Sequence, residues 1–466
     1  GKVWLLTLFF SGVFFMWPYQ TMVQAQTFLS TKFPDAADSI SPIMMMCLTL
    51  PIFLAHCLFV FTGCGSRISY TCRILGACTV IILLNIILCA ILVSTDSETL
   101  LLPAMYTTAF FMQSTGAFVQ PAYFEMAGLL PSYLTSQSVS AGIGAAGVVV
   151  CAVQMFSRLV SNGLQLASLG SLQGLTYFFL ALSATAACLQ AMMFVLLMRP
   201  SKAFEEYIAE VDHTAGVAPS HNASVAEEAQ PAPAESMRST EGGHHHEMDI
   251  TAARFLALRH CWPSVLCIVV CFGSTTLLWP SISGVVCVGT GKWAATLQSW
   301  WFELNVFAFN LGDFLGRAEK VSLKWGAKVL GPMAQFVLSL VRVAIAAPLI
   351  FTAAAPQLYN PEIASWVVLV TIFVFGLTNG WLTTVCFMRA PKAMPAETSS
   401  TVAEQASTLL ALGMYWGLFS GCVLAYTLTS YPLKGVLGKC FAAASQSGGG
   451  DMMHWQDMAA ATAVVV

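Results

Sequence analysis

The chain has 466 residues, of which 57% are hydrophobic and 9% are charged, and its formal net charge is -3. Soluble domains carry about 25% charged residues, so this composition excludes a soluble globular protein and predicts a polytopic protein embedded in a lipid bilayer. The small net charge gives no reason to expect a nucleic-acid partner.

A helix that crosses a membrane needs about 20 mostly apolar residues. About eleven segments meet this requirement, which predicts an all-α membrane protein with about eleven transmembrane helices. The expected spans are residues 3–28, 42–62, 73–94, 101–124, 137–160, 174–198, 262–283, 297–316, 328–352, 363–386 and 406–429.

One long polar insert divides these spans into six and five. Residues 199–260 are rich in Ala, Pro, Glu and Ser, and such a segment cannot bury enough apolar surface to fold, so we expect a disordered loop. The predicted organisation is a six-helix half in residues 1–198, this loop, a five-helix half in residues 261–430 and a tail in residues 431–466.

The distribution of Lys and Arg predicts the orientation. If the N-terminus is cytoplasmic, most of these residues fall on the cytoplasmic side, as membrane proteins favour. The long loop is then cytoplasmic, and an odd number of spans makes the tail extracellular. We expect the plasma membrane as the location.

The eighth expected span contains the most informative pattern of the chain, which runs from Phe309 to Arg317. Asp313 and Arg317 are four residues apart, so on a helix they share one face, one turn apart. Charged side chains are costly in hydrocarbon and face a bundle interior or a water-filled cavity. This span is therefore expected to line a polar pathway.

Several expected spans also carry side-chain amides, which are Gln24, Gln26, Asn85, Gln113, Gln120, Asn305, Asn310 and Asn379. An amide offers both donors and an acceptor, which suits an uncharged polar ligand such as a base or a sugar. The alternative is that each amide joins neighbouring helices by a hydrogen bond, which is common in membranes. His56 has a similar alternative, since a hydrogen-bonded core residue is expected ahead of a proton carrier.

Nothing in the sequence indicates an enzyme. It has no Gly-rich phosphate loop, no nucleophile elbow and no paired metal-ligand motif in the expected spans, so we expect no catalytic residues, no cofactor and no metal site. Most of the fifteen cysteines lie in apolar runs, where thiols behave as small hydrophobic side chains.

Several separate motifs together resemble the equilibrative nucleoside transporter family, and the resemblance covers nearly all the expected spans. The motifs are Gln120 with Ala127-Gly128-Leu129-Leu130-Pro131 and Gly142/Gly147, the Phe309–Arg317 pattern, Arg342 with Pro348-Leu349, and Gly376-Leu377-Thr378-Asn379-Gly380. The resemblance implies a fold like the major facilitators, in which two helical halves rock about a central site. It also implies a nucleoside or nucleobase as the small-molecule substrate.

The chain departs from the family pattern in its first span. Members often carry Pro-Trp-Asn there, whereas this chain reads Pro18-Tyr19-Gln20. Tyr in place of Trp is similar to protozoan members, some of which carry purine bases or couple transport to protons. The resemblance therefore favours a purine, and it leaves proton coupling open.

The predicted substrate site draws on both halves. Its expected residues are Tyr19, Gln20, Gln120, Asn310, Asp313 and Arg317. The resemblance implies that Gln120 faces the cargo, and its amide matches the ring nitrogens and exocyclic group of a purine. Tyr19 would pack against the flat ring. Two alternatives remain, a facilitator-type transporter of another small polar solute and a non-transporting membrane sensor with the same fold.

Overall fold

The computed structural model describes twelve stretches of the chain. They are residues 2–33, 36–62, 68–129, 133–163, 169–201, 250–279, 282–283, 294–322, 326, 329–354, 361–394 and 400–430. Most of the segment predicted as a disordered loop, and the whole predicted tail from residue 431, lie outside these stretches, as do Leu130 and Pro131 of the first motif.

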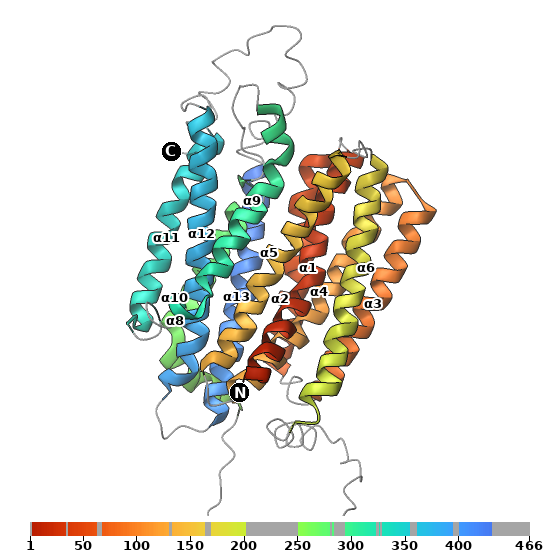
Figure 1. Cartoon of the computed structure of the whole chain (residues 1–466). Coiled ribbons are helices and arrows are strands. Elements are labelled where there is room, and N and C mark those ends of the chain that lie inside the picture. The colour runs from red at the N-terminus through yellow and green to blue at the C-terminus, as the bar shows by residue number, and fades with distance from the viewer. Residues whose placement is uncertain are drawn as a thin grey trace, which may run out of the picture.

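Eleven long helices in the described part of the chain run roughly alongside one another (Figure 1). They are α1 (Lys2–Lys32), α2 (Ala37–Thr62), α3 (Tyr70–Ser94), α4 (Glu98–Leu129), α5 (Tyr133–Gly163), α6 (Leu169–Met193), α8 (Ile250–Leu278), α9 (Ala294–Gly316), α11 (Pro332–Ala354), α12 (Pro361–Arg389) and α13 (Ser400–Ser430). Three short helices accompany them, a π-helix (Phe194–Met198), α10 (Glu319–Ser322) and a 3-10 helix (Ala390–Ala393). The all-α prediction is confirmed.

One helix begins earlier than expected. α8 starts at Ile250, inside the segment 199–260 that we predicted to be a loop. No Pro or Gly interrupts the chain from there to His260, and Ala253 and Ala257, one turn apart, are fully buried. The prediction was wrong for residues 250–260. The boundary of the loop was drawn from the polar composition of the residues before Ile250, and the short amphipathic stretch that follows them was included in it by mistake.

Nine of the described helices are long and apolar enough to cross a membrane by length and composition. α4 and α9 are comparably long but fall outside this set. The polar residues that interrupt them include Gln120 in α4 and Asn310 and Asp313 in α9. Spanning helices that carry such groups are the natural candidates to line a polar site inside a bundle.

The helices form two groups that follow the order of the chain. α1 to α6 pack chiefly on one another and are called the N-terminal half, and α8, α9, α11, α12 and α13 do likewise and are called the C-terminal half. The halves meet mainly where α5 packs against α9 and where α2 packs against α13. A site between the halves must therefore lie close to these helices.

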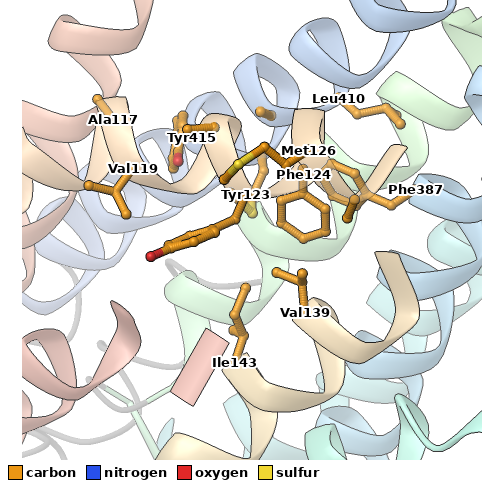
Figure 2. Packing of buried hydrophobic residues seen from close by; sticks show 14 of the residues in the cluster. Ala117, Val119, Tyr123, Phe124, Met126, Val139, Ile143, Phe387, Leu410 and Tyr415 are labelled. Atoms are coloured by element: carbon orange, nitrogen blue, oxygen red, sulfur yellow. The ribbon is translucent and has the colours of Figure 1, made fainter. Parts of the chain in front are cut away.

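An apolar cluster joins the two halves near the ends of α4 and α12 (Figure 2). Phe124 of α4 stacks on Phe387 of α12 with ring centroids 4.8 Å apart. Figure 2 places Met126 of α4 and Val139 of α5 close to this pair, and Leu410 of α13 belongs to the same buried cluster. At this end of the bundle the halves are therefore in direct apolar contact.

Candidate functional site

The predicted pair at the end of α9, where Arg317 is the first residue after the helix, is an ion pair in the structure. Arg317 Nε donates to Asp313 Oδ2 at 2.7 Å, and Arg317 Nη2 donates to Asp313 Oδ1 at 3.2 Å. Both residues are buried, with exposed fractions of 5% and 6%. The spacing argument is thus confirmed, and the bidentate geometry is the strong, orientation-specific form of this contact.

The same pair connects the two halves of the protein. Arg317 Nη1 donates to Ser140 Oγ of α5 at 2.7 Å, and Gln137 Nε2 of α5 donates to the carbonyl oxygen of Arg317 at 2.8 Å. Ser140 also lies 3.1 Å from Thr384 Oγ1 of α12. Arg317 therefore fixes the position of α5 relative to α9.

Asn379 of α12 extends the network on the other side of Asp313. Its Nδ2 donates to Asp313 Oδ1 at 2.8 Å, and its Oδ1 accepts from Thr275 Oγ1 of α8 at 3.0 Å. The two ends of one amide thus join the carboxylate to a third helix of the C-terminal half. The amide cannot turn over without breaking both hydrogen bonds.

Arg342 of α11 completes the network and has no carboxylate partner among its described contacts. Its five N–H groups are all used, with acceptors on Cys271 (O), Ser274 (Oγ), Thr275 (Oγ1), Phe375 (O) and Thr378 (Oγ1). Its guanidinium also lies 3.5 Å from the centroid of the Phe375 ring. We call Ser140, Thr275, Asp313, Arg317, Arg342 and Asn379 the Asp313 network.

Four glycines bring α9 and α12 close enough for this network to form. A Cβ at Gly312, Gly316, Gly376 or Gly380 would overlap a backbone carbonyl oxygen of the facing helix, and for Gly380 that oxygen belongs to Asp313. Small residues let helix backbones approach closely. The glycines of both sequence motifs therefore place Asn379 within reach of the Asp313 carboxylate.

Gln120 and Tyr19 lie elsewhere, facing α13. Tyr415 of α13 donates its O–H to Gln120 Oε1 at 2.8 Å, while the acceptor of Gln120 Nε2 within the described part of the chain is the sulfur of Met414, at 3.8 Å. Tyr19 is half-buried against the apolar cluster that contains Cys422 of α13. Because sulfur is a weak acceptor, the N–H groups of the Gln120 side chain remain able to donate to a ligand.

The Cys151 thiol of α5 lies between Asn310 of α9 and Gln24 of α1. Asn310 Nδ2 lies 3.4 Å from Cys151 Sγ of α5, and Gln24 Nε2 of α1 lies 3.1 Å from the same sulfur. Gly147, one turn before Cys151, leaves the space that the Asn310 side chain occupies. Gln20, one turn before Gln24, is buried and its Oε1 has no protein partner among the described residues.

Of the six expected residues, hydrogen bonds in the described part of the chain join Asp313 to Arg317, while Asn310 contacts Cys151 instead. Asn310, Asp313 and Arg317 line one side of α9, and Asp313 and Arg317 belong to a single network. Within the described residues, no hydrogen bond joins Gln120 to either Asp313 or Arg317. A ligand that touches both groups would have to bridge them.

Sequence reasoning missed several contacts between helices. It noted Asn379 and Arg342 in motifs but did not predict what they bind, and it treated Cys151 as a packing residue. It also missed the ion pair between Arg158 of α5 and Glu303 of α9, whose Nη1 and Oε1 are 2.5 Å apart. A signal existed for Asn379, because its Gly-rich motif resembles the one around Asp313.

His56 matches the alternative of a core residue. Its Nε2 lies 3.4 Å from the carbonyl oxygen of Thr408, and its ring packs edge-on against Tyr415 at 4.9 Å. Both contacts reach α13 from α2, so His56 helps to join the halves.

Comparison with known proteins decides the family. A family model described as nucleoside transporter matches residues 106–430. The chain belongs to the equilibrative nucleoside transporter family. It is 24% identical over 401 residues to equilibrative nucleoside transporter 1 of Rattus norvegicus, covering 83% of this chain and 81% of that one. A shorter match, 30% identical over 188 residues, is to nucleoside transporter 2 of Leishmania donovani and covers 39% of this chain and 34% of that one.

Solved structures show the fold. The proton:xylose symporter XylE has a TM-score of 0.55 at 12% identity, and the match covers 95% of this chain and 94% of XylE. A peptide-bound transporter of the POT family has a TM-score of 0.56 at 13% identity, with 95% and 93% covered. XylE is a member of the major facilitator superfamily, so the expectation of a major-facilitator-like, multi-pass membrane protein is confirmed.

Proposed function

We propose that this nucleoside transporter family member carries nucleosides and nucleobases, purines in particular, by alternating access of its two halves. The observation that carries the purine proposal is a buried donor with only a weak acceptor and a buried acceptor with no donor, among the described residues. The donor is Gln120 Nε2, whose acceptor among the described residues is the Met414 sulfur, and the acceptor is Gln20 Oε1. A purine edge presents both kinds of group.

Each amide would contribute a modest share of the binding free energy. A typical hydrogen bond is worth about 0.5–1.5 kcal/mol net, so two would discriminate purines by their exocyclic groups rather than supply the whole affinity. Tyr19 would supply flat apolar area for the ring, as aromatic side chains do. Tyr415 would orient Gln120 by holding its carbonyl oxygen.

Asp313 and Arg317 would serve a sugar or a polar substituent. They are engaged with each other in this conformation, and a carboxylate or a guanidinium can exchange such a partner for a ligand hydroxyl. Asn310, one turn before Asp313, would complete the polar rim. This placement supports a role for the pair in both holding α9 and receiving the ligand.

Alternating access is supported by the kind of contact between α5 and α9. Arg317 with Ser140 lies at one end of this helix pair, and Arg158 with Glu303 lies toward the other. Polar contacts of this sort can break and re-form with little loss of packing. XylE, which shares the fold, has been solved in partially occluded and inward-open conformations, with TM-scores of 0.53 to this chain.

The orientation remains part of the proposal. We place the N-terminus in the cytoplasm and the protein in the plasma membrane, on the distribution of Lys and Arg. Tags at Gly1 and after Val466 should differ in accessibility in intact cells. Equal accessibility of the two tags would contradict the proposed topology.

One uptake experiment tests the proposed function. Purified full-length protein in liposomes is assayed for uptake of a radiolabelled purine nucleoside, with competition by bases, nucleosides and sugars at two pH values. Purines should compete best. Competition by sugars alone would favour a transporter of another solute, and binding without uptake would favour a sensor. A dependence on the pH gradient would indicate coupling to protons.

A further inference from the structure

A small polar cavity lies between α1, α5 and α6 of the N-terminal half. Its volume is about 20 Å³. It is lined by Thr21, Gln24, Ala25 and Phe28 of α1, Gln154 of α5, and Leu175, Thr176 and Phe179 of α6. None of these residues belongs to the Asp313 network or to the predicted substrate site.

Three residues that line this cavity each carry a buried oxygen atom with no protein partner among the described residues. They are Thr21 Oγ1, Gln24 Oε1 and Gln154 Oε1. The three residues are 1%, 4% and 4% exposed, so their oxygens are also removed from bulk solvent. Buried polar groups in folded proteins are satisfied by protein or by ordered water, so three of them on one cavity indicate a ligand there.

The donors and acceptors define what this ligand is. Two amide oxygens accept and one hydroxyl can donate, and a water molecule offers two donors and an acceptor. A cavity of this size holds one water, which needs about 10–15 Å³, and is far too small for a nucleoside. A metal cation is disfavoured, because no carboxylate is among the lining residues and an unpaired buried charge is costly.

The cavity is connected to the predicted substrate site through Gln24. Gln24 lines the cavity and its Oε1 has no protein partner among the described residues, while its Nε2 donates to Cys151 Sγ at 3.1 Å, and that sulfur also accepts from Asn310. A partner that holds the oxygen end of the amide would therefore fix its nitrogen end as well. Without such a partner the amide could turn over and withdraw its donor from Cys151.

We propose that this cavity is a binding site for one ordered water molecule, which bridges Thr21, Gln24 and Gln154. The bridge ties α1 to α5 and holds Gln24 against Cys151, and so makes Thr21 and Gln154 positioning residues for Asn310. The presence of the water is proposed independently of the proposed function, whereas its effect on transport rests on that function.

The direct test is a cryo-EM map of the full-length protein at a resolution that shows ordered water. A density peak is expected within about 2.6–3.2 Å of all three oxygens. Absence of the peak, or a Gln24 side chain turned toward a protein donor, would overturn the proposal.

A matched set of variants tests the bridge without any substrate. Thr21→Val removes the hydroxyl at nearly constant shape, and Thr21→Ser keeps it. The thermal midpoint of the purified Val variant should fall by about 2 °C, while the Ser variant should match the unaltered protein. Thr185→Val, at an exposed hydroxyl on α6, is the control and should change nothing. Equal midpoints for Thr21→Val and Thr21→Ser would count against the water.

Two further measurements test whether the site holds a cation instead of water, and whether the water affects transport. If NaCl raises the thermal midpoint relative to choline chloride in the unaltered protein but not in Thr21→Val, the site holds a cation and the water is refuted.

In uptake assays, Thr21→Val should raise the KM for a purine about 2–10-fold, as the loss of one hydrogen bond would. A changed midpoint with an unchanged KM would overturn the positioning role. A protein that carries no nucleoside would overturn the proposed function and leave the density and midpoint results standing.

Discussion

The two sides of the candidate site differ in how far the protein satisfies its own polar groups. In the Asp313 network, both carboxylate oxygens and all five N–H groups of Arg342 have partners. Along α1, in contrast, Gln20 and Gln24 each leave an oxygen without a protein partner, and Gln26 leaves both atoms of its amide unpaired among the described residues.

This difference indicates that the two sides of the site have different roles. A buried polar group without a partner costs about 1–3 kcal/mol, so it persists where a ligand or water fills the gap. The Asp313 network is therefore expected to hold five helices in register in this conformation, and to contact a ligand only where Asp313 or Arg317 exchanges one of these contacts for it. The α1 side is expected to take up ligand and water.

The largest effect is expected from Arg317→Leu. Removing one partner of a buried ion pair costs about 3–5 kcal/mol, because Asp313 keeps its charge with Asn379 as its one remaining donor among the described residues. We expect transport to be lost and surface expression to fall. Arg259→Leu, at an exposed guanidinium on α8, is the control for loss of one cation and should behave normally. Near-normal uptake in the Arg317 variant would contradict the network.

A packing change should have the next largest effect. Gly380→Ala places a methyl group against the carbonyl oxygen of Asp313, which pushes α12 from α9 and lengthens the bond from Asn379. Overpacking of this kind costs about 1–3 kcal/mol, and the thermal midpoint of purified protein measures it. Gly76→Ala, where nothing lies within 4 Å of the added atom, is the control. If the two variants have the same thermal midpoint, the close approach of α9 and α12 does not contribute to stability.

The smallest effect concerns the group that orients Gln120. Tyr415→Phe removes the hydrogen bond to Gln120 Oε1 and leaves the ring in place. Loss of one neutral hydrogen bond should raise the KM for a purine about 2–10-fold without lowering expression. The assay is concentration-dependent uptake, normalised to surface protein. An unchanged KM would mean that Gln120 does not need this partner.

The sequence was sufficient for features that arise within one helix. Apolar runs predicted the long helices, and a four-residue spacing predicted the pairing of Asp313 with Arg317. It was insufficient where partners come from distant segments. Asn379 reaches Asp313 across 66 residues, and nothing local to either residue specifies that contact.

Cys151 shows the same limit more sharply. A thiol in an apolar run is typical of packing, and its role between two amides depends on how α1, α5 and α9 cross. The ion pair of Arg158 with Glu303 likewise depends on the pairing of α5 with α9. Which helices meet is a property of the whole bundle, and spacing within one segment does not reveal it.

The central claim is that buried amides without strong protein partners read the base, and Gln120→Leu, which removes an amide whose nitrogen has only a sulfur acceptor among the described residues, tests it most directly. The measurement is the ranking of competing purines that differ in their exocyclic groups, such as adenosine and inosine, in uptake by this variant and by the unaltered protein. The account predicts that uptake weakens more than expression and that the ranking changes, because the leucine can neither donate nor accept. An unchanged ranking with transport intact would assign Gln120 to helix packing and place the site elsewhere.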